Sequence, residues 1–174
     1  MKGIFSYLVL WAFAATASFA GETPADALLI TFTQERTNAV RITKNPVRMD
    51  RLAASLCAAA PVKPPGDPHY SKYAHVYVSA KGAPVMQATS GVFPEGTIIL
   101  KEKFNDQEGK HTELFTGMVK REPGYNAECG DWEFFILPAD GKKIFSRGKL
   151  QNCMDCHVEY KASDFVTKNY TYLH

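Results

Sequence analysis

The stretch GTIILKEKF, from Gly96 to Phe104, is rich in the β-branched and aromatic residues that favour a strand. From Lys72 onward the apolar residues recur with a period of two, the spacing at which alternate side chains share one face of a sheet. The same composition recurs in Tyr73–Val78, Thr112–Lys120 and Asp131–Leu137. Turn-rich segments follow the later strands, at residues 105–111, 121–130 and 138–143. Because short turns join antiparallel neighbours, we predict an antiparallel meander of at least four strands.

Helical patterns flank these strands. Asn45-Pro46 is typical of a helix cap with proline at the first helical position, and apolar residues at near-helical spacing follow it. We therefore predict an amphipathic helix from about 46 to 60, and a helical turn at 84–88. At residues 27–32 the period does not separate a short strand from the start of a helix. The expected class is α+β, mostly β: a meander with a few flanking helices and a C-terminal attachment segment.

That attachment segment is a short cysteine motif near the C-terminus. Residues Cys153–His157 read CMDCH, and Cys-x-x-Cys-His is the attachment signature of a c-type haem. In such a site the thiols of Cys153 and Cys156 become thioethers to the porphyrin vinyl groups, while His157 binds the iron from the proximal side. We predict one covalent haem c, with His157 as the metal ligand.

The other cysteines, Cys57 and Cys129, each stand alone in the sequence. They complete no second Cys-x-x-Cys pair, which a four-ligand zinc site would require. A thioredoxin-type motif needs no histidine after its second cysteine and normally lies early in a βαβ unit. In an oxidising compartment Cys57 and Cys129 either form a disulfide or stay separate, and their spacing does not decide between these alternatives.

The N-terminus has the pattern of a secretory signal. The positive start Met1-Lys2 precedes an apolar run from Ile4 to Phe19, and Ser18-Phe19-Ala20 is a small-x-small cleavage site. Because the run is shorter than the roughly 20 residues of a spanning helix, we predict that residues 1–20 are removed on export. The alternative is an uncleaved membrane anchor. Residues 21–174 are expected to form a single domain in the periplasm, with no membrane attachment after cleavage.

The formal net charge is +2, and lysine and arginine are scattered along the chain. Nothing in this composition indicates a nucleic-acid partner. Lys142, Lys143 and Lys161 lie on either side of the haem motif. They form either a mildly basic rim for an acidic redox partner or an ordinary solvated surface.

The order of these motifs resembles that of the cytochrome P-460 family, which includes the related cytochrome c′-beta. The resemblance covers about residues 70 to 165. It rests on the strand Val76–Val78, the turn and strand Phe93–Glu102, the strand Gly130–Phe134 and the motif Cys153–His157 placed after them. It implies a largely β domain, commonly a homodimer, with one five-coordinate c-haem and an open distal face. Cytochrome P-460 oxidises hydroxylamine and passes electrons to an acceptor, whereas cytochrome c′-beta looks like a nitric oxide binder or scavenger.

The resemblance gives Lys101 a particular role. Lys101 matches a lysine that in cytochrome P-460 is covalently bonded to the porphyrin edge, and such a bond would distort the ring and so tune the haem. The alternative is an ordinary strand lysine, in alternation with Glu102 and Lys103.

This sequence departs from the hydroxylamine-oxidising members at two positions. Those members carry an arginine where this chain has Ala74, and a distal carboxylate that falls near Gly148. Hydroxylamine oxidation sheds protons, so a base near the iron-bound substrate is expected. The candidate bases at other positions are Glu102, His75, Asp131 and Glu133.

Phe93 matches an aromatic residue that cytochrome c′-beta packs over the iron. An apolar lid of this kind favours neutral diatomic ligands such as nitric oxide. The alternative for Phe93 is core packing beside a turn. A sixth iron ligand would instead make the protein a simple electron-transfer cytochrome, and the candidates for that ligand are Met86, Met118, His69 and His111.

Overall fold

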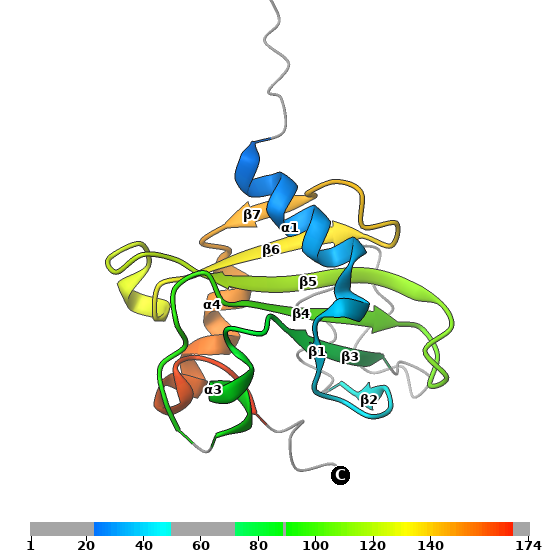
Figure 1. Cartoon of the computed structure of the whole chain (residues 1–174), viewed down its shortest axis with the longest axis horizontal. Coiled ribbons are helices and arrows are strands. Elements are labelled where there is room, and N and C mark those ends of the chain that lie inside the picture. Colours follow the sequence, from blue (N-terminus) through cyan, green and yellow to red (C-terminus); the bar gives the residue numbers. More distant parts are fainter. Residues whose placement is uncertain (1–22, 50–71, 89, 169–174) are drawn as a thin grey trace, which may run out of the picture.

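The structure is a computed structural model, and it describes residues 23–49, 72–88 and 90–168. A seven-stranded sheet forms its centre (Figure 1). The strands pair in the order β1-β3-β4-β5-β6-β7, and β2 pairs with β3 on the same edge as β1. Their bounds are β1 (Val40–Arg41), β2 (Val47–Arg48), β3 (Tyr73–Val78), β4 (Ile98–Phe104), β5 (Thr112–Lys120), β6 (Trp132–Pro138) and β7 (Ser146–Gly148).

The predicted meander is confirmed as strands β3 to β6, and the chain has the α+β, mostly β architecture expected of it. Each of these strands pairs antiparallel with the next. Strands β3 and β5 have the predicted bounds, whereas β4 begins at Ile98 rather than at Gly96. The reason is a turn before β4, in which the Thr97 N–H donates to the Pro94 carbonyl and Gly96 has a φ of +77°.

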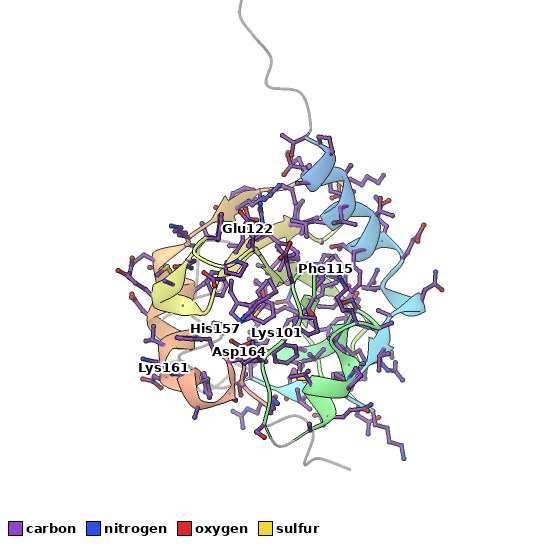
Figure 2. All side chains as sticks on the ribbon, turned by 60° about the vertical axis from the view of Figure 1, so that its left-hand side comes forward. Lys101, Phe115, Glu122, His157, Lys161 and Asp164 are labelled. Carbon is purple, nitrogen blue, oxygen red and sulfur yellow. The ribbon has the colours of Figure 1, made fainter. Side chains whose placement is uncertain are left out.

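The sheet has two covered faces, because successive side chains of a strand point to opposite sides. Helix α1 (Pro24–Gln34) crosses one face, and α4 (Gln151–His157) lies behind the other (Figure 1). The core on the α1 face includes Leu29, Tyr77, Leu100, Phe135, Leu137 and Phe115, the last of which is labelled in Figure 2. The core on the α4 face includes Val76, Ile99, Met118, Phe134, Met154 and Phe165.

Helix α1 settles the ambiguity at residues 27–32 in favour of a helix. Thr23 caps it: the Thr23 hydroxyl accepts from the Asp26 N–H, and the Asp26 carboxylate accepts from the Thr23 N–H. Leu29 and Thr33 lie four residues apart and are the buried residues of the helix. The capping box therefore starts a helix whose apolar stripe covers the sheet.

The helix predicted from about 46 to 60 is wrong at its start. Val47 and Arg48 form β2, which pairs with Ala74 and Tyr73 of β3. The Met49 N–H then donates to the Lys72 carbonyl. Pro46 suits a helix start, but the free edge of β3 offers backbone partners, and the β-branched Val47 fits a strand. The remainder of that prediction, residues 50–60, lies outside the described residues.

Short helices complete the described chain. The helical turn predicted at 84–88 is α3 (Ala83–Gln87), and the motif Cys153–His157 lies on the short helix α4. The 3₁₀ turns are η1 (Arg36–Asn38), η2 (Ala127–Cys129) and η3 (Val158–Ser163). Within residues 23–49, 72–88 and 90–168, no helix is long and apolar enough to cross a bilayer.

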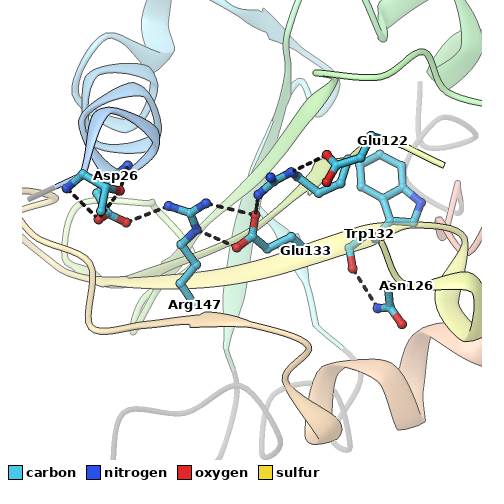
Figure 3. A network of polar contacts seen from close by, with 8 residues as sticks. Asp26, Glu122, Asn126, Trp132, Glu133 and Arg147 are labelled. Atoms are coloured by element: carbon cyan, nitrogen blue, oxygen red, sulfur yellow. Dashed lines mark hydrogen bonds and ion pairs between the residues drawn. The ribbon is translucent and has the colours of Figure 1, made fainter. Parts of the chain in front are cut away.

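A buried carboxylate fastens α1 to the sheet (Figure 3). Glu133 of β6, whose side chain is 5% exposed, accepts from the guanidinium groups of Arg147 at 2.6 Å and Arg121 at 2.5 Å. Arg147 also donates to Asp26 of α1 at 2.8 Å. Burial alone would raise the pKa of Glu133, but hydrogen bonds from the two arginines outweigh it and lower that pKa. Hydrogen bonds from Thr23 and Arg147 likewise lower the pKa of Asp26.

Arg147→Met should weaken this junction and change its response to acid. The folded-state pKa values of Glu133 and Asp26 lie below their ordinary values, so their stabilisation is complete above about pH 5 and is lost as the pH falls through the folded values. We expect Arg147→Met to lower the free energy of unfolding at neutral pH by about 1–3 kcal/mol and to flatten its decline below about pH 5. Denaturant unfolding at a series of pH values measures both. Arg48→Met, which removes an exposed arginine from β2, is the control, and an unchanged acid slope in Arg147→Met would contradict the assignment.

Candidate haem site

A small hollow, with a cavity volume of about 40 Å³, opens on the α4 face of the sheet. The central strands β4, β5 and β6 form one wall, and α4 contributes the other. The residues that line it are Ile99, Lys101, Thr116, Gly117, Met118, Phe134, Cys153 and His157. The sheet thus brings residues from widely separated parts of the sequence to the cysteine motif.

Helix α4 presents the motif to this hollow. Cys153 and His157 lie four residues apart, so they share one face of the helix, and both line the hollow. Met154, between them in sequence, is buried in the core of the same sheet face. Met154 therefore anchors the helix in the core, while Cys153 and His157 face the hollow.

His157 is held in one tautomer. Its Nδ1 lies 2.7 Å from the backbone carbonyl of Phe165, and a carbonyl only accepts, so Nδ1 carries the proton. Nε2 is then the basic nitrogen, with a lone pair available to a metal. Phe134 packs against the imidazole, with ring centroids 5.1 Å apart. Burial, followed by the charge of Lys101, lowers the pKa of His157 to about 4, so the ring is neutral at ordinary pH.

Lys101 faces His157 from the sheet. Figure 2 labels both residues in the interior, and both line the hollow. The effect of Lys101 on the pKa of His157 is a second sign of their proximity. Thr116 lies directly opposite Lys101 on β5 and lines the same wall.

Residues 57–168 match the sequence model of the family described as Cytochrome P460. The chain belongs to the cytochrome P460 family. The resemblance read from the strands and the cysteine motif is thereby confirmed, and the family indicates a haem-binding cytochrome with a c-type haem. No curated protein matches the sequence closely enough to be compared with it.

The residues around the hollow fit the haem that the cytochrome P460 family implies. The donor set is a neutral imidazole whose Nε2 is left basic by the bond from Nδ1 to Phe165. A cysteine thiol lies one helical turn before it, on the same wall. The remainder of the lining is largely apolar, as suits a porphyrin face. His157 would bind the iron, and Cys153 and Cys156 would hold the porphyrin.

Two predicted catalytic residues, Glu102 and His75, lie on the opposite face from Lys101. They are cross-strand partners in the β3–β4 register. Glu102 is buried and binds Arg36 through both carboxylate oxygens, at 2.5 and 2.8 Å, and also accepts from Tyr77 and Thr112. His75 Nδ1 lies 2.9 Å from the Thr43 hydroxyl, and burial lowers its pKa. In the described structure these two side chains therefore hold the α1 side together and do not reach the hollow.

Phe93 is buried in the core on the α4 face and is not among the lining residues. Its ring packs edge-on against Trp132, with centroids 5.5 Å apart. Its backbone N–H donates to Asp164 Oδ2 at 2.8 Å. Phe93 therefore packs beside the segment that follows the haem motif.

The other candidates are dispersed. Met118 lines the hollow and Met86 is buried in the adjoining core. His111 is exposed and bonded to Asp106, and His69 lies outside the described residues. Asp131 accepts backbone N–H groups within its own loop, and Glu133 belongs to the α1 face.

The disulfide considered between Cys57 and Cys129 stays a prediction, because Cys57 lies outside the described residues. Burial raises the pKa of the Cys129 thiol to about 11, which leaves it poorly reactive.

Sequence reasoning missed Thr116 and Phe165. Thr116 could have been found from the strand register, because it lies opposite Lys101. Phe165 contributes a backbone carbonyl, for which no side-chain pattern exists. Its approach to His157 depends on the turn after η3.

Glu102→Gln and Lys101→Met form a matched pair at adjacent positions on opposite faces of β4. Glu102→Gln leaves Arg36 without a charged partner and should lower the free energy of unfolding by about 1–3 kcal/mol. We expect the visible haem spectrum of Glu102→Gln to equal that of wild type, and that of Lys101→Met to differ. Absorption spectra and denaturant unfolding of the purified holoproteins test both. Equal spectral changes in the two variants would contradict this assignment of faces.

Proposed function

We propose that this protein is a periplasmic mono-haem c-type cytochrome that oxidises hydroxylamine, in the manner of cytochrome P-460. The main support for the proposal is that Lys101, Cys153 and His157 line the same hollow. In cytochrome P-460 a lysine of the matching strand is bonded to the porphyrin edge. Lys101 lies where a group held by Cys153 and His157 would come within its reach.

Each residue at the hollow has its own role toward the haem in this proposal. Cys153, which lines the hollow, and Cys156 of the same helix would hold the porphyrin through thioethers, and His157 would offer the Nε2 lone pair to the iron. A haem held there would supply an iron that binds a small nitrogen substrate and accepts electrons one at a time. A bond from the neutral amine of Lys101 to the porphyrin edge would remove one hydrogen from each partner. This two-electron oxidation would require an oxidant such as a peroxide, which would be reduced to water.

A second candidate function is reversible nitric oxide binding, as in cytochrome c′-beta. Among the described residues that line the hollow there is no carboxylate to accept protons from a nitrogen substrate. Ile99, Met118 and Phe134 make the lining largely apolar, which suits a neutral diatomic ligand. In this reading Lys101 remains an unmodified lysine.

The proposal extends to location and partners. The signal pattern at residues 1–20 supports export to the periplasm, where a redox protein would accept the electrons. Lys142, Lys143 and Lys161 are exposed and flank the motif in the sequence, and they offer weak positive charge to an acidic partner. By its resemblance to the family the protein acts as a homodimer, and its small net charge gives no reason to include nucleic acid.

Lys101→Ala tests the covalent bond. A third attachment distorts the porphyrin, so wild type should show a strongly red-shifted Soret band in the reduced state, and Lys101→Ala an ordinary high-spin c-type spectrum. Lys101→Arg is the control, because it keeps the positive charge beside His157 without the lysine amine. We expect Lys101→Arg to resemble Lys101→Ala. Identical spectra for wild type and Lys101→Ala would refute the bond.

Turnover separates the catalyst from the gas binder. With an artificial one-electron acceptor, wild type should oxidise hydroxylamine steadily, and Lys101→Ala should lose most of that rate. If wild type reduces no acceptor in the presence of hydroxylamine yet binds nitric oxide reversibly, the enzyme proposal fails and the second candidate holds.

A further inference from the structure

The turn after η3 has an unusual backbone. Asp164 has a φ of +55° and Phe165 a φ of +62°, so two consecutive residues other than glycine are left-handed. An aspartate tolerates this conformation, but a bulky residue such as Phe165 is rarely found in it. Such a turn persists only where its surroundings hold it.

Asp164 is held on several sides. Both carboxylate oxygens accept from Lys120 Nζ at 2.8 Å. Oδ2 also accepts the Phe93 N–H at 2.8 Å, and the Asp164 carbonyl accepts from Trp132 Nε1 at 2.8 Å. The side chains of Lys120 and Asp164 are only 9% and 8% exposed, so this is a buried ion pair that links the end of β5 to the turn.

Lys120 and Phe165 have fixed places of their own. The Lys120 ammonium lies 5.1 Å from the centroid of a Trp132 ring, and Trp132 is its cross-strand partner. The Phe165 ring covers Gly130, where a Cβ would come within 2.5 Å of Phe165 Cδ2. With the ring seated there and the backbone turned at Asp164, the Phe165 carbonyl faces His157 Nδ1 at 2.7 Å.

We propose that Asp164, paired with Lys120, is a positioning residue for the proximal histidine. It fixes the direction of the Phe165 carbonyl and thereby the strength of the bond from His157 Nδ1. A strong bond at Nδ1 makes Nε2 a better donor to iron, which favours the ferric state. The inference rests on the proposed role of His157 as the axial ligand, and it gives the Phe93 backbone a part in the same support.

Asp164→Asn tests the inference with little change in size. The amide retains an oxygen for the Phe93 N–H but loses the charge that holds Lys120. We expect the iron–histidine stretching frequency of the ferrous protein, measured by resonance Raman, to fall. We also expect the haem reduction potential to rise, because the weaker donor favours ferrous iron.

Two further variants separate positioning from general loss of stability. Glu133→Gln removes a carboxylate of similar burial, also paired with cations, from the opposite face of the sheet. It should lower stability while leaving the stretching frequency and the potential at their wild-type values. Lys120→Arg keeps the charge and should remain close to wild type, whereas Lys120→Gln should shift both readouts as Asp164→Asn does.

The outcomes distinguish this inference from the proposed function. If wild type itself shows no iron–histidine band, the proposed ligation fails. If wild type shows the band and Asp164→Asn leaves it and the potential unchanged, the positioning role is overturned. Equal shifts in Asp164→Asn and Glu133→Gln also overturn it. If Asp164→Asn does not fold, the two Lys120 variants test the inference instead. Equal stretching frequencies and reduction potentials in Lys120→Arg and Lys120→Gln would then overturn the positioning role.

Discussion

The alternation of side chains along β4 determines where chemistry can occur in this protein. Because neighbouring residues point to opposite faces, Lys101 reaches the hollow beside His157 while Glu102 binds Arg36 on the α1 side. A shift of one residue in the β3–β4 pairing would exchange the two. The apolar cores on both faces oppose that shift, since Leu100 belongs to one core and Ile99 to the other. The packing of the sheet therefore keeps Lys101 on the face of the hollow.

The orientation of helix α4 depends on contacts with the rest of the protein. Helix α4 has only seven residues, and so short a helix gains little from its own hydrogen bonds. Its position depends on Met154, which is buried in the core, and on the chain beyond it, which returns to the sheet at the Lys120–Asp164 pair. One sheet thus supports both sides of the site: β4 carries Lys101 directly, and β5 holds the segment that steadies His157.

The sequence predicts those parts of this structure that depend on local pattern. The four strands of the meander are amphipathic or rich in β-branched residues, and the haem motif is confined to Cys153–His157, so spacing alone identifies both. The prediction of a helix at 46–60 is wrong at its start, because pairing with the free edge of β3 outweighed the favourable position of Pro46. The carboxylate of Glu102 suggests a catalytic base, but its alternation with Lys101 along the strand puts the two side chains on opposite faces of the sheet. The turn at Asp164 and Phe165 depends on partners far away in sequence, and no local signal encodes it.

Lys101 links the two candidate functions through its protonation. As an ammonium group it places a positive charge beside His157, which lowers the pKa of the imidazole and keeps Nε2 ready for a metal. The same charge would favour ferrous iron, because it repels the more positive ferric iron more strongly. Once bonded to the porphyrin, its nitrogen no longer carries the ammonium charge, and its influence becomes mechanical, through distortion of the ring. The two proposed functions would thus use Lys101 in two ways. In the gas binder it would remain an ammonium group, and in the enzyme its nitrogen would lose two protons in forming the bond to the ring.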